Sequence, residues 1–192
     1  VVLHTVLPNP DLALLNMMQQ INRYATALIV MTQTSLKILV QDYGIDAQKI
    51  TVIPHGTHLV EFTSKSLLKE KYQIANRKVI STFGLLSSGK CIETSINALK
   101  SIVKTHPEVL FLVIGKTHPS VVKNEGELYR NELEARIKEL HLEKYVQFVN
   151  KYLPLPELLE YLQLTDIYLF TSKDRNQAVS GTFSYAISCG CP

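Results

Sequence analysis

The chain has 192 residues, of which 46% are hydrophobic and 19% charged, a composition typical of globular proteins that excludes disordered and collagen-like chains. Twenty Lys and Arg against seventeen Asp and Glu give a formal net charge of +3, and because both signs are dispersed, no nucleic-acid partner is expected. The longest apolar run, residues 109–114, is far shorter than the roughly 20 residues of a transmembrane segment.

The number and spacing of the cysteines indicate the redox compartment in which the protein is expected to reside. The chain has three, Cys91, Cys189 and Cys191, an odd number with no repeated metal-ligand spacing. This usage favours a reducing compartment, the cytoplasm, over a secreted disulfide framework. The first residue lies inside an expected strand and the last follows a helix pattern directly, so we expect the chain to be a fragment of a longer protein.

In the first part of the chain, short apolar runs alternate with amphipathic patterns. The pattern predicts strands over residues 1–7, 27–31 and 49–53. It predicts one helix that begins after an Asp11 cap and another over 35–43 that ends at Gly44. Residues 54–65, which contain Pro54, Gly56 and two histidines, interrupt the alternation and are the expected domain boundary.

After this boundary the alternation resumes. Helices are expected over residues 65–73, 92–103, 129–140, 155–162 and 182–188, and strands over 79–83, 109–114, 146–149 and 167–170. We therefore expect two domains, residues 1–58 and 59–192. Strands that are apolar at every position must be covered on both faces, so the predicted fold class is α/β, with doubly wound parallel sheets. Ligands of such sheets bind at the carboxyl ends of the strands.

The loop after the strand 79–83 has the composition of a phosphate-binding loop. Gly84, Gly89 and serines allow the backbone to approach an anion, the next helix would present free N–H groups, and Lys90 adds a positive charge. The spacing also fits a P-loop, although Cys91 stands where Ser or Thr should bind magnesium. A plain structural turn is the third interpretation.

A second polar loop precedes the helix expected over 182–188. Small residues again open the helix, because Ser180, Gly181 and Thr182 stand at its start. Their N–H groups could hold phosphate oxygens, and two such loops together suggest a diphosphate ligand. The alternative is an ordinary helix N-cap.

Several motifs in order and spacing resemble those of a known family, the retaining glycosyltransferases of family four (glycosyl transferases group 1). The matching segments are residues 4–5, 53–57, 82–86 with Lys90, 112–115 and 186–192. The resemblance covers nearly the whole chain. It implies a GT-B fold, in which two Rossmann-like domains face a cleft and the second domain holds the nucleotide-sugar donor.

The resemblance also assigns roles to individual residues. Gly84 and Lys90 fall on the glycine and lysine that meet the donor diphosphate, whereas Leu85 replaces an arginine. Lys116, Lys173 or Arg175 could supply the missing cation. The family's two glutamates, which hold the donor sugar and the ribose, fall on Gln177 and Tyr185; both replacements can still form hydrogen bonds to hydroxyls but carry no charge.

Two further positions follow from the resemblance. Lys151 and Tyr152 lie in the region that lines the nucleobase pocket, where Tyr152 could stack on a base; the alternative is a loop tyrosine at the sheet edge. His4 matches a histidine that faces the donor sugar from the first domain; the alternative is a structural histidine. His55 and His58 lack the partners of a metal site.

The sequence thus predicts a retaining glycosyltransferase that moves a sugar from a nucleotide-diphosphate donor to a hydroxyl acceptor. The expected catalytic residues are His4, Lys90 and Gln177, and no metal or other cofactor is expected. The acceptor, whether glycan, lipid or small molecule, is not specified, and peripheral membrane contact is compatible with the sequence. The alternatives are a non-catalytic nucleotide-sugar-binding module and a P-loop phosphotransferase. The fragment alone is expected to be inactive.

Overall fold

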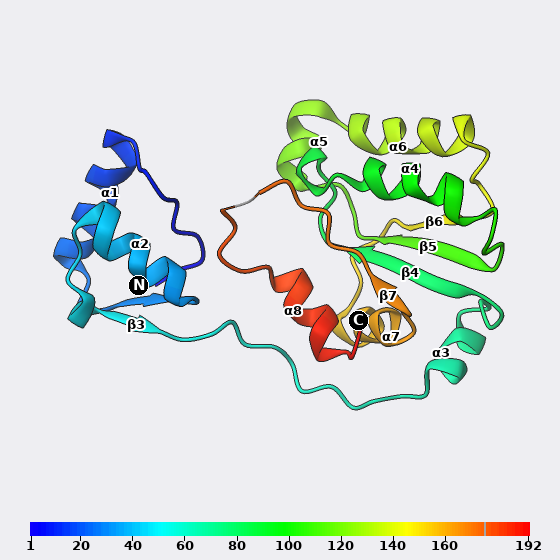
Figure 1. The fold of residues 1–192 in the computed structure, drawn as a ribbon, viewed down its shortest axis with the longest axis horizontal. Helices are drawn as coiled ribbons and strands as arrows, with labels where there is room; N and C mark the ends of the chain where they lie inside the picture. Colours follow the sequence, from blue (N-terminus) through cyan, green and yellow to red (C-terminus); the bar gives the residue numbers. More distant parts are fainter. Residues whose placement is uncertain (175) are drawn as a thin grey trace. The chain divides into compact units, whose positions relative to one another are not determined.

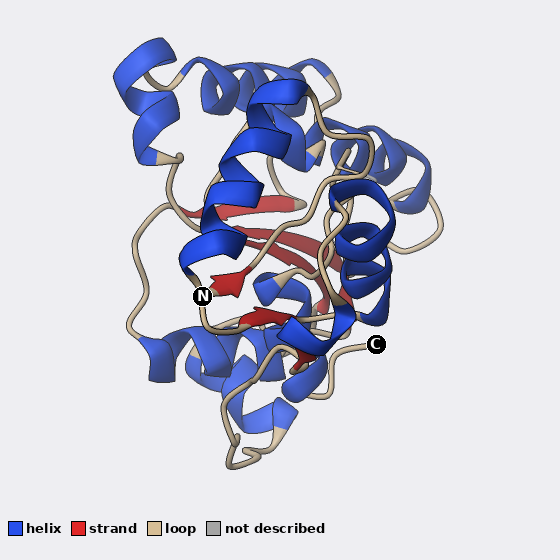
Figure 2. Cartoon of the chain, turned by 90° about the vertical axis from the view of Figure 1, so that its left-hand side faces the viewer, coloured by secondary structure: helices blue, strands red, loops and turns tan. Residues whose placement is uncertain are grey.

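The computed structural model describes residues 1–174 and 176–192 and divides the chain into two compact units (Figure 1). The first unit comprises Val1–Thr57 and Asp174–Gly181, and the second comprises His58–Lys173 and Thr182–Pro192. Residues 53–64, which span the first crossing between the units, contain neither helix nor strand. Helices are blue and strands red in Figure 2.

The first unit is a small parallel sheet with two helices. Its strands β1 (Val2–Leu3), β2 (Leu28–Val30) and β3 (Ile50–Val52) lie in the order β1-β2-β3. The helices are α1 (Leu12–Tyr24) and α2 (Gln33–Tyr43), and a 3-10 turn, η1, spans Ala47–Lys49. The predicted caps are confirmed, since the Asp11 carboxylate accepts from the amide of Leu14 and Gly44 ends α2 at a φ of 64°.

The second unit is larger and also parallel. Its strands β4 (Lys78–Phe83), β5 (Val109–Ile114), β6 (Val146–Val149) and β7 (Ile167–Tyr168) lie in the order β6-β5-β4-β7. Its helical segments are α3 (Lys65–Lys71), η2 (Ser88–Lys90), α4 (Ile92–Ile102), α5 (Pro119–Glu125), α6 (Leu128–Glu139), α7 (Leu155–Gln163) and α8 (Gly181–Ser188), the last of which begins at the unit boundary.

Strand β5 shows why helices must cover both faces of this sheet. Its side chains alternate between two hydrophobic clusters: Leu110 and Leu112 pack with residues of α7 and α8, whereas Phe111 and Val113 pack with residues of α4 and α6. Figure 1 shows these two pairs of helices on opposite sides of the sheet. The doubly wound parallel architecture expected from the apolar strands is therefore confirmed.

Three elements differ most from the predictions. The strand expected over 1–7 is only Val2–Leu3, because β2 is short and pairs with just those two residues. The strand expected over 167–170 likewise ends at Tyr168. Helix α5 was not predicted; His118 caps it and Pro119 stands in its first turn. No helix of the described residues is long and apolar enough to cross a membrane.

Candidate functional site

Two glycines at the carboxyl ends of β4 and β5 bring their loops into close contact. The Gly84 amide donates to the Ile114 carbonyl at 3.0 Å. A β-carbon on Gly115, which has a φ of 128°, would lie 2.1 Å from the Gly84 carbonyl oxygen. Only glycine fits this position, because any other residue would collide with the neighbouring backbone and adopt a strained conformation. The two loops therefore form one surface at the edge of the sheet.

Gly84 lies beneath the side chains of Lys90 and Thr182. A β-carbon on Gly84 would lie 3.2 Å from Cγ2 of Thr182 and 3.5 Å from Nζ of Lys90. Lys90 comes from the turn η2 and Thr182 from the first turn of α8, so segments far apart in sequence meet here. Lys90 and Thr182 come from the two loops that the sequence analysis predicts to bind a diphosphate. The structure thus brings one residue of each loop together.

The charge of Lys90 is not balanced within the described part of the chain. The ammonium forms no ion pair with a described carboxylate, and burial lowers the pKa of Lys90 from its ordinary value of 10.5. A half-buried cation without an acidic partner is stabilised by a bound anion. Lys90 is therefore the group of this cluster best suited to hold a phosphate.

The segment after β7 lies along the same loop. The Thr171 hydroxyl donates to the Lys90 carbonyl at 2.6 Å, and the Lys173 amide donates to the Gly89 carbonyl at 3.0 Å. Lys173 is exposed beside the loop and so is a nearby second cation; Arg175 lies outside the described residues. Leu85 is 39% exposed and adds an apolar side chain where the resemblance implies an arginine.

The first amide of α4 is not free, contrary to the expectation from the sequence. The Ile92 amide donates to the hydroxyl of Tyr129 at 2.9 Å, and that hydroxyl donates to the Glu93 carboxylate at 2.6 Å. Cys91, which precedes the helix, has a left-handed backbone with a φ of 50°. A phosphate would meet a carboxylate at this helix end, so the geometry does not support the P-loop interpretation.

Helix α8 begins at the expected place. It starts at Gly181, with Ser180 immediately before it, as the small residues predicted. By contact, Ser180 and Gly181 belong to the first unit, where the Gly181 α-carbon faces the imidazole of His55. Thr182 belongs to the second unit and lies over Gly84.

Tyr185 lies one helical turn after Thr182. Its hydroxyl is 2.8 Å from Nε2 of His58, and the two rings meet edge to face with centroids 5.2 Å apart. On another side its ring lies 6.2 Å from that of Phe83, the last residue of β4. The sequence offered no indication of the His58 contact, because 127 residues separate the partners.

The structure does not join the residues after β6 to this cluster by any described contact. The Lys151 ammonium pairs with the Glu157 carboxylate at 2.6 Å, and this hydrogen bond raises the pKa of Lys151. Tyr152 is 83% exposed. Both residues follow a strand at the carboxyl edge of the sheet, and the Tyr152 ring is accessible for stacking.

The remaining predicted residues lie in the first unit. His4 directly follows β1 and is exposed. Gln177 lines a cavity of about 200 Å³, and His4 is not among the described lining residues. The other residues around this cavity are Val6, Pro8, Thr32, Thr34, Ser35, Ile38, Asn176 and Ala178. Within the first unit, Gln177 therefore faces the start of α2 and the segment after β1.

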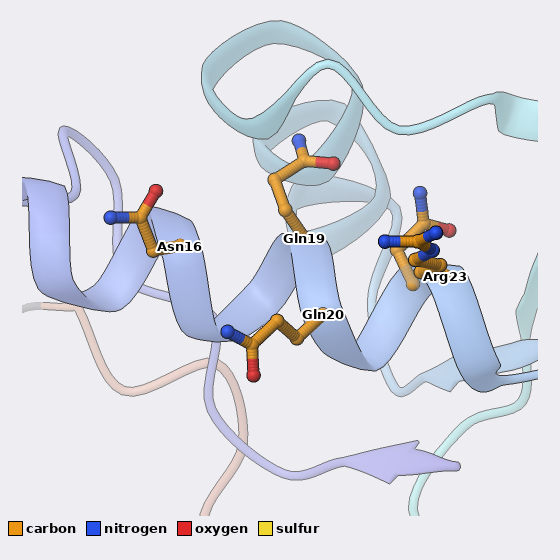
Figure 3. A pocket seen from close by; sticks show the side chains of 5 residues that line it. Asn16, Gln19, Gln20 and Arg23 are labelled. Carbon is orange, nitrogen blue, oxygen red and sulfur yellow. The ribbon is translucent and has the colours of Figure 1, made fainter.

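A second hollow of the first unit lies along α1 and contains none of the predicted residues. Its volume is about 600 Å³, and it is lined by Asn16, Gln19, Gln20, Asn22 and Arg23 (Figure 3). The Gln19 side chain donates to the Tyr43 carbonyl and Lys49 donates to the Asn22 carbonyl. These polar groups tie α1 to the neighbouring segments.

The described residues contain no group of three or more His, Cys, Asp or Glu side chains placed to hold a metal ion. His55 and His58 belong to different units, and His58 contacts Tyr185. The three cysteines are buried, and burial raises the pKa of Cys191 to about 11. Cys189 and Cys191 pack in the same hydrophobic cluster as Leu162, as expected from their place at a helix end.

Comparison with known proteins bears out the fold. Mannosylfructose-phosphate synthase of Agrobacterium fabrum is 24% identical over 178 residues, which are 90% of this chain and 38% of the relative. The structure of Anabaena Alr3699/HepE in complex with UDP is similar over 100% of this chain and 51% of that protein, with a TM-score of 0.80 and 24% identity. Sucrose-phosphate synthase of Thermosynechococcus elongatus is 21% identical and matches 95% of this chain and 43% of its own length, with a TM-score of 0.75.

The chain thus spans about half the length of the solved structures and less of the curated relative. Its architecture is that of the GT-B glycosyltransferases, with Rossmann-like parallel sheets. The sequence model described as "Glycosyl transferases group 1" matches residues 64–192, which include the loop of Gly84 and Lys90 and the whole of α8. The chain belongs to the glycosyl transferases group 1 family.

Proposed function

We propose that the protein transfers a sugar from a nucleotide-diphosphate donor to a hydroxyl acceptor with retention of anomeric configuration. The observation that supports this most is the position of the Lys90 ammonium, half-buried above Gly84 and beside Thr182 at the carboxyl edge of a parallel sheet. Its buried charge suits the diphosphate of a donor.

The diphosphate is proposed to bind Lys90 and the backbone of two loops. Gly84 gives close access to the first loop, and Ser180, Gly181 and Thr182 supply the start of α8. The cleft between Gly84, Leu85 and Lys90 has a volume of only about 10 Å³, at the lower limit for holding one water molecule, so the ligand would lie at its mouth. Lys173 is the proposed substitute for the arginine that Leu85 replaces.

The rest of the donor is assigned by resemblance. Gln177 and His4 are proposed to contact the donor sugar, Tyr185 the ribose, and Lys151 with Tyr152 the nucleobase. Gln177 and Tyr185 can exchange hydrogen bonds with sugar hydroxyls without carrying charge. Solved structures of the similar Anabaena protein contain UDP and UDP-glucose, so UDP-glucose is the first donor to test.

Retention without a protein nucleophile requires attack on the face from which the leaving group departs. The acceptor oxygen forms a bond to the anomeric carbon as the bond from that carbon to the phosphate oxygen breaks. The acceptor proton passes to that phosphate oxygen. The protein's part is to stabilise the leaving diphosphate through Lys90 and the amides of α8, and to orient both sugars.

Calorimetric titration of the complete protein with UDP tests the diphosphate site. Lys90→Ala should weaken binding about tenfold or more, because a charge-assisted hydrogen bond is lost. The matched control is Lys100→Ala, which removes an exposed lysine in the last turn of α4 and should bind UDP normally. Equal UDP affinities of the Lys90 variant and the parent would contradict the assignment.

A second candidate function is a non-catalytic nucleotide-sugar-binding module. The observation in its favour is the replacement of charged groups by Leu85, Gln177 and Tyr185. The two candidates differ in turnover. A transferase releases UDP from UDP-glucose, whether the sugar passes to an acceptor or to water, whereas a binding module does not. Tight UDP-glucose binding with no UDP release over hours, with acceptor sugars supplied, would favour the module.

A further inference from the structure

His58 and Tyr185 form a hydrogen-bonded pair within the second unit that no motif accounts for. Nε2 of His58 lies 2.8 Å from the Tyr185 hydroxyl, and the rings meet edge to face at an interplanar angle of 69°. His58 belongs to the segment without helix or strand that precedes α3, whereas Tyr185 is in the middle of α8. The pair therefore ties this extended segment to the helix.

Tyr185 also borders the cluster around Lys90. Its ring lies 6.2 Å from that of Phe83, which directly precedes Gly84. Residues three apart on a helix share a face, so Tyr185 stands on the same side of α8 as Thr182, which contacts the Gly84 position. Three residues of helix rise about 4.5 Å, so the tyrosine follows the proposed diphosphate site by about one turn.

This spacing suits the part of a nucleotide that follows its phosphates. The ribose is linked directly to the diphosphate and carries hydroxyl groups that can donate and accept hydrogen bonds. A phenol hydroxyl can also donate and accept a hydrogen bond. Whether the Tyr185 hydroxyl can bind the ribose depends on the direction in which the hydroxyl points. Because this hydroxyl is only half-buried, a second group is needed to fix its direction.

We propose that His58 is a positioning residue of the nucleotide site, which holds the Tyr185 hydroxyl toward the ribose hydroxyls of the bound donor. The inference rests on the proposed function, because it requires a nucleoside diphosphate at Lys90. If His58 carries its proton on Nδ1, Nε2 accepts from the phenol and the phenol oxygen accepts from the ribose. If the proton is on Nε2, the imidazole donates and the phenol hydrogen points to the ribose. Either tautomer leaves one direction of the Tyr185 oxygen for the ligand.

His58 is exposed. For this reason an experiment can distinguish a positioning role of His58 from a structural one. A solvent-exposed hydrogen bond adds little to folding stability, so removal of the imidazole should leave the unfolding midpoint nearly unchanged. It should instead release the phenol and reduce the protein's discrimination between ligands with and without ribose hydroxyls. Discrimination is therefore the readout that a merely structural contact would not move.

The experiment compares the affinities of the complete protein for UDP and for 2′,3′-dideoxyuridine diphosphate by calorimetry. The parent should bind UDP about tenfold more tightly than the dideoxy analogue. Tyr185→Phe should remove this preference by weakening UDP binding alone. His58→Ala should reduce the preference at least about threefold, and His58→Gln, which keeps a hydrogen-bonding group, should restore part of it.

A double variant and a control complete the design. Adding His58→Ala to Tyr185→Phe should cause no further loss, because the histidine acts only through the tyrosine hydroxyl. His106→Ala removes a histidine next to β5 that pairs with Glu108, and it should leave the preference unchanged. Circular dichroism and the thermal midpoint of each variant establish that it is folded.

The outcomes separate the two proposals. Failure of the parent to bind any of UDP, GDP and ADP would overturn the proposed function and with it this inference; if GDP or ADP binds instead of UDP, the same comparison is made with that nucleotide and its dideoxy analogue. Tight UDP binding with the parent's full preference retained in His58→Ala would overturn the role of His58 alone. A preference retained in Tyr185→Phe would remove Tyr185 as the ribose contact. Loss of preference in both single variants without an additive double effect would establish the pair.

Discussion

The hydroxyl of Tyr129 accepts a hydrogen bond from the Ile92 amide at 2.9 Å and donates one to the Glu93 carboxylate at 2.6 Å. A side chain of α6 thus closes the amino end of α4, directly after the loop that carries Lys90. Burial and, to a smaller extent, the bond to Glu93 raise the pKa of Tyr129, so the phenol stays protonated and able to donate.

Tyr129→Phe should destabilise the protein by about 1–3 kcal/mol, because the Ile92 amide loses its partner in a buried position. Urea unfolding measures this change. Tyr24→Phe, which removes a hydroxyl from a side chain that is 83% exposed, is the matched control and should leave stability nearly unchanged. A Tyr129 variant as stable as the parent would show that water satisfies the amide.

Gly115→Ala should be among the most damaging substitutions in the second unit. The new β-carbon would meet the Gly84 carbonyl oxygen at 2.1 Å, and the φ of 128° is one that alanine rarely adopts. Strain and overpacking together should cost on the order of 3 kcal/mol and displace the Gly84 loop. Gly89→Ala, where the nearest atom is 3.8 Å away, is the control. Equal unfolding midpoints for the two variants would refute the close approach.

The affinity for UDP should depend on pH through Lys90. Burial lowers the pKa of Lys90 below 10.5, so the ammonium loses its proton at a lower pH than an exposed lysine does. Only the charged form attracts the diphosphate, so affinity should be full near neutrality and fall as the pH rises through the Lys90 pKa. Lys90→Arg keeps its charge and should flatten this alkaline decline, as titrations between about pH 7 and about pH 10 would show.

Asp166 should contribute to stability in a way that is lost in acid. Burial alone would raise its pKa, but hydrogen bonds from Lys69 at 2.5 Å and from the Val79 amide at 2.8 Å outweigh burial and hold the pKa below 3.8. Stability from the charged form is therefore complete above pH 3.8 and is lost as the pH falls through the lower folded-state pKa.

Asp166→Asn should lower the free energy of unfolding at neutral pH by about 1.5 to 3 kcal/mol, the range for a charged hydrogen bond. It should also weaken the dependence of stability on pH below 3.8. Urea unfolding at a series of acidic pH values measures both effects. A variant with the parent's acid dependence would show that other carboxylates account for it.

Cys191 should react very slowly with alkylating reagents in the folded protein. Burial raises its pKa to about 11, and its thiol donates to the Leu162 carbonyl at 2.9 Å. At pH 8 only about one thiol in a thousand is then the reactive thiolate. Mass spectrometry after a short iodoacetamide pulse should find Cys191 unmodified in buffer and modified in urea. Rapid labelling in buffer would mean that the end of α8 opens readily.

Sequence patterns predicted the elements in which the order of apolar and polar residues directly indicates which side chains are buried. Residues 109–114 are apolar at every position, and the observed strand has those bounds. Parallel strands end at a common edge, so the pattern also placed Gly84, Lys90 and Thr182 in one neighbourhood. The short length of the first strand could not be predicted from its own residues, because it depends on the length of its partner, β2.

Side-chain contacts between distant segments could not be predicted from the sequence either. Tyr129 was predicted only as part of an apolar helix face, and nothing in that pattern shows that its hydroxyl reaches Ile92. His58 was considered only as a metal ligand, a role for which the sequence offered no partners, and nothing pointed to a contact with a tyrosine 127 residues away. Such pairs depend on the packing of whole elements, which local periodicity does not encode.

Main-chain hydrogen bonds join the loops after β4 and β5. Beyond the bond from Gly84, the Leu86 amide donates to the Lys116 carbonyl at 2.8 Å, and the His118 amide donates to the Leu86 carbonyl at 2.9 Å. The path of the chain past Leu85 is thereby set by its neighbours rather than by the leucine side chain. Position 85 is consequently a natural point for engineering, where a charged or aromatic side chain can be introduced on an unchanged backbone to probe the proposed nucleotide site.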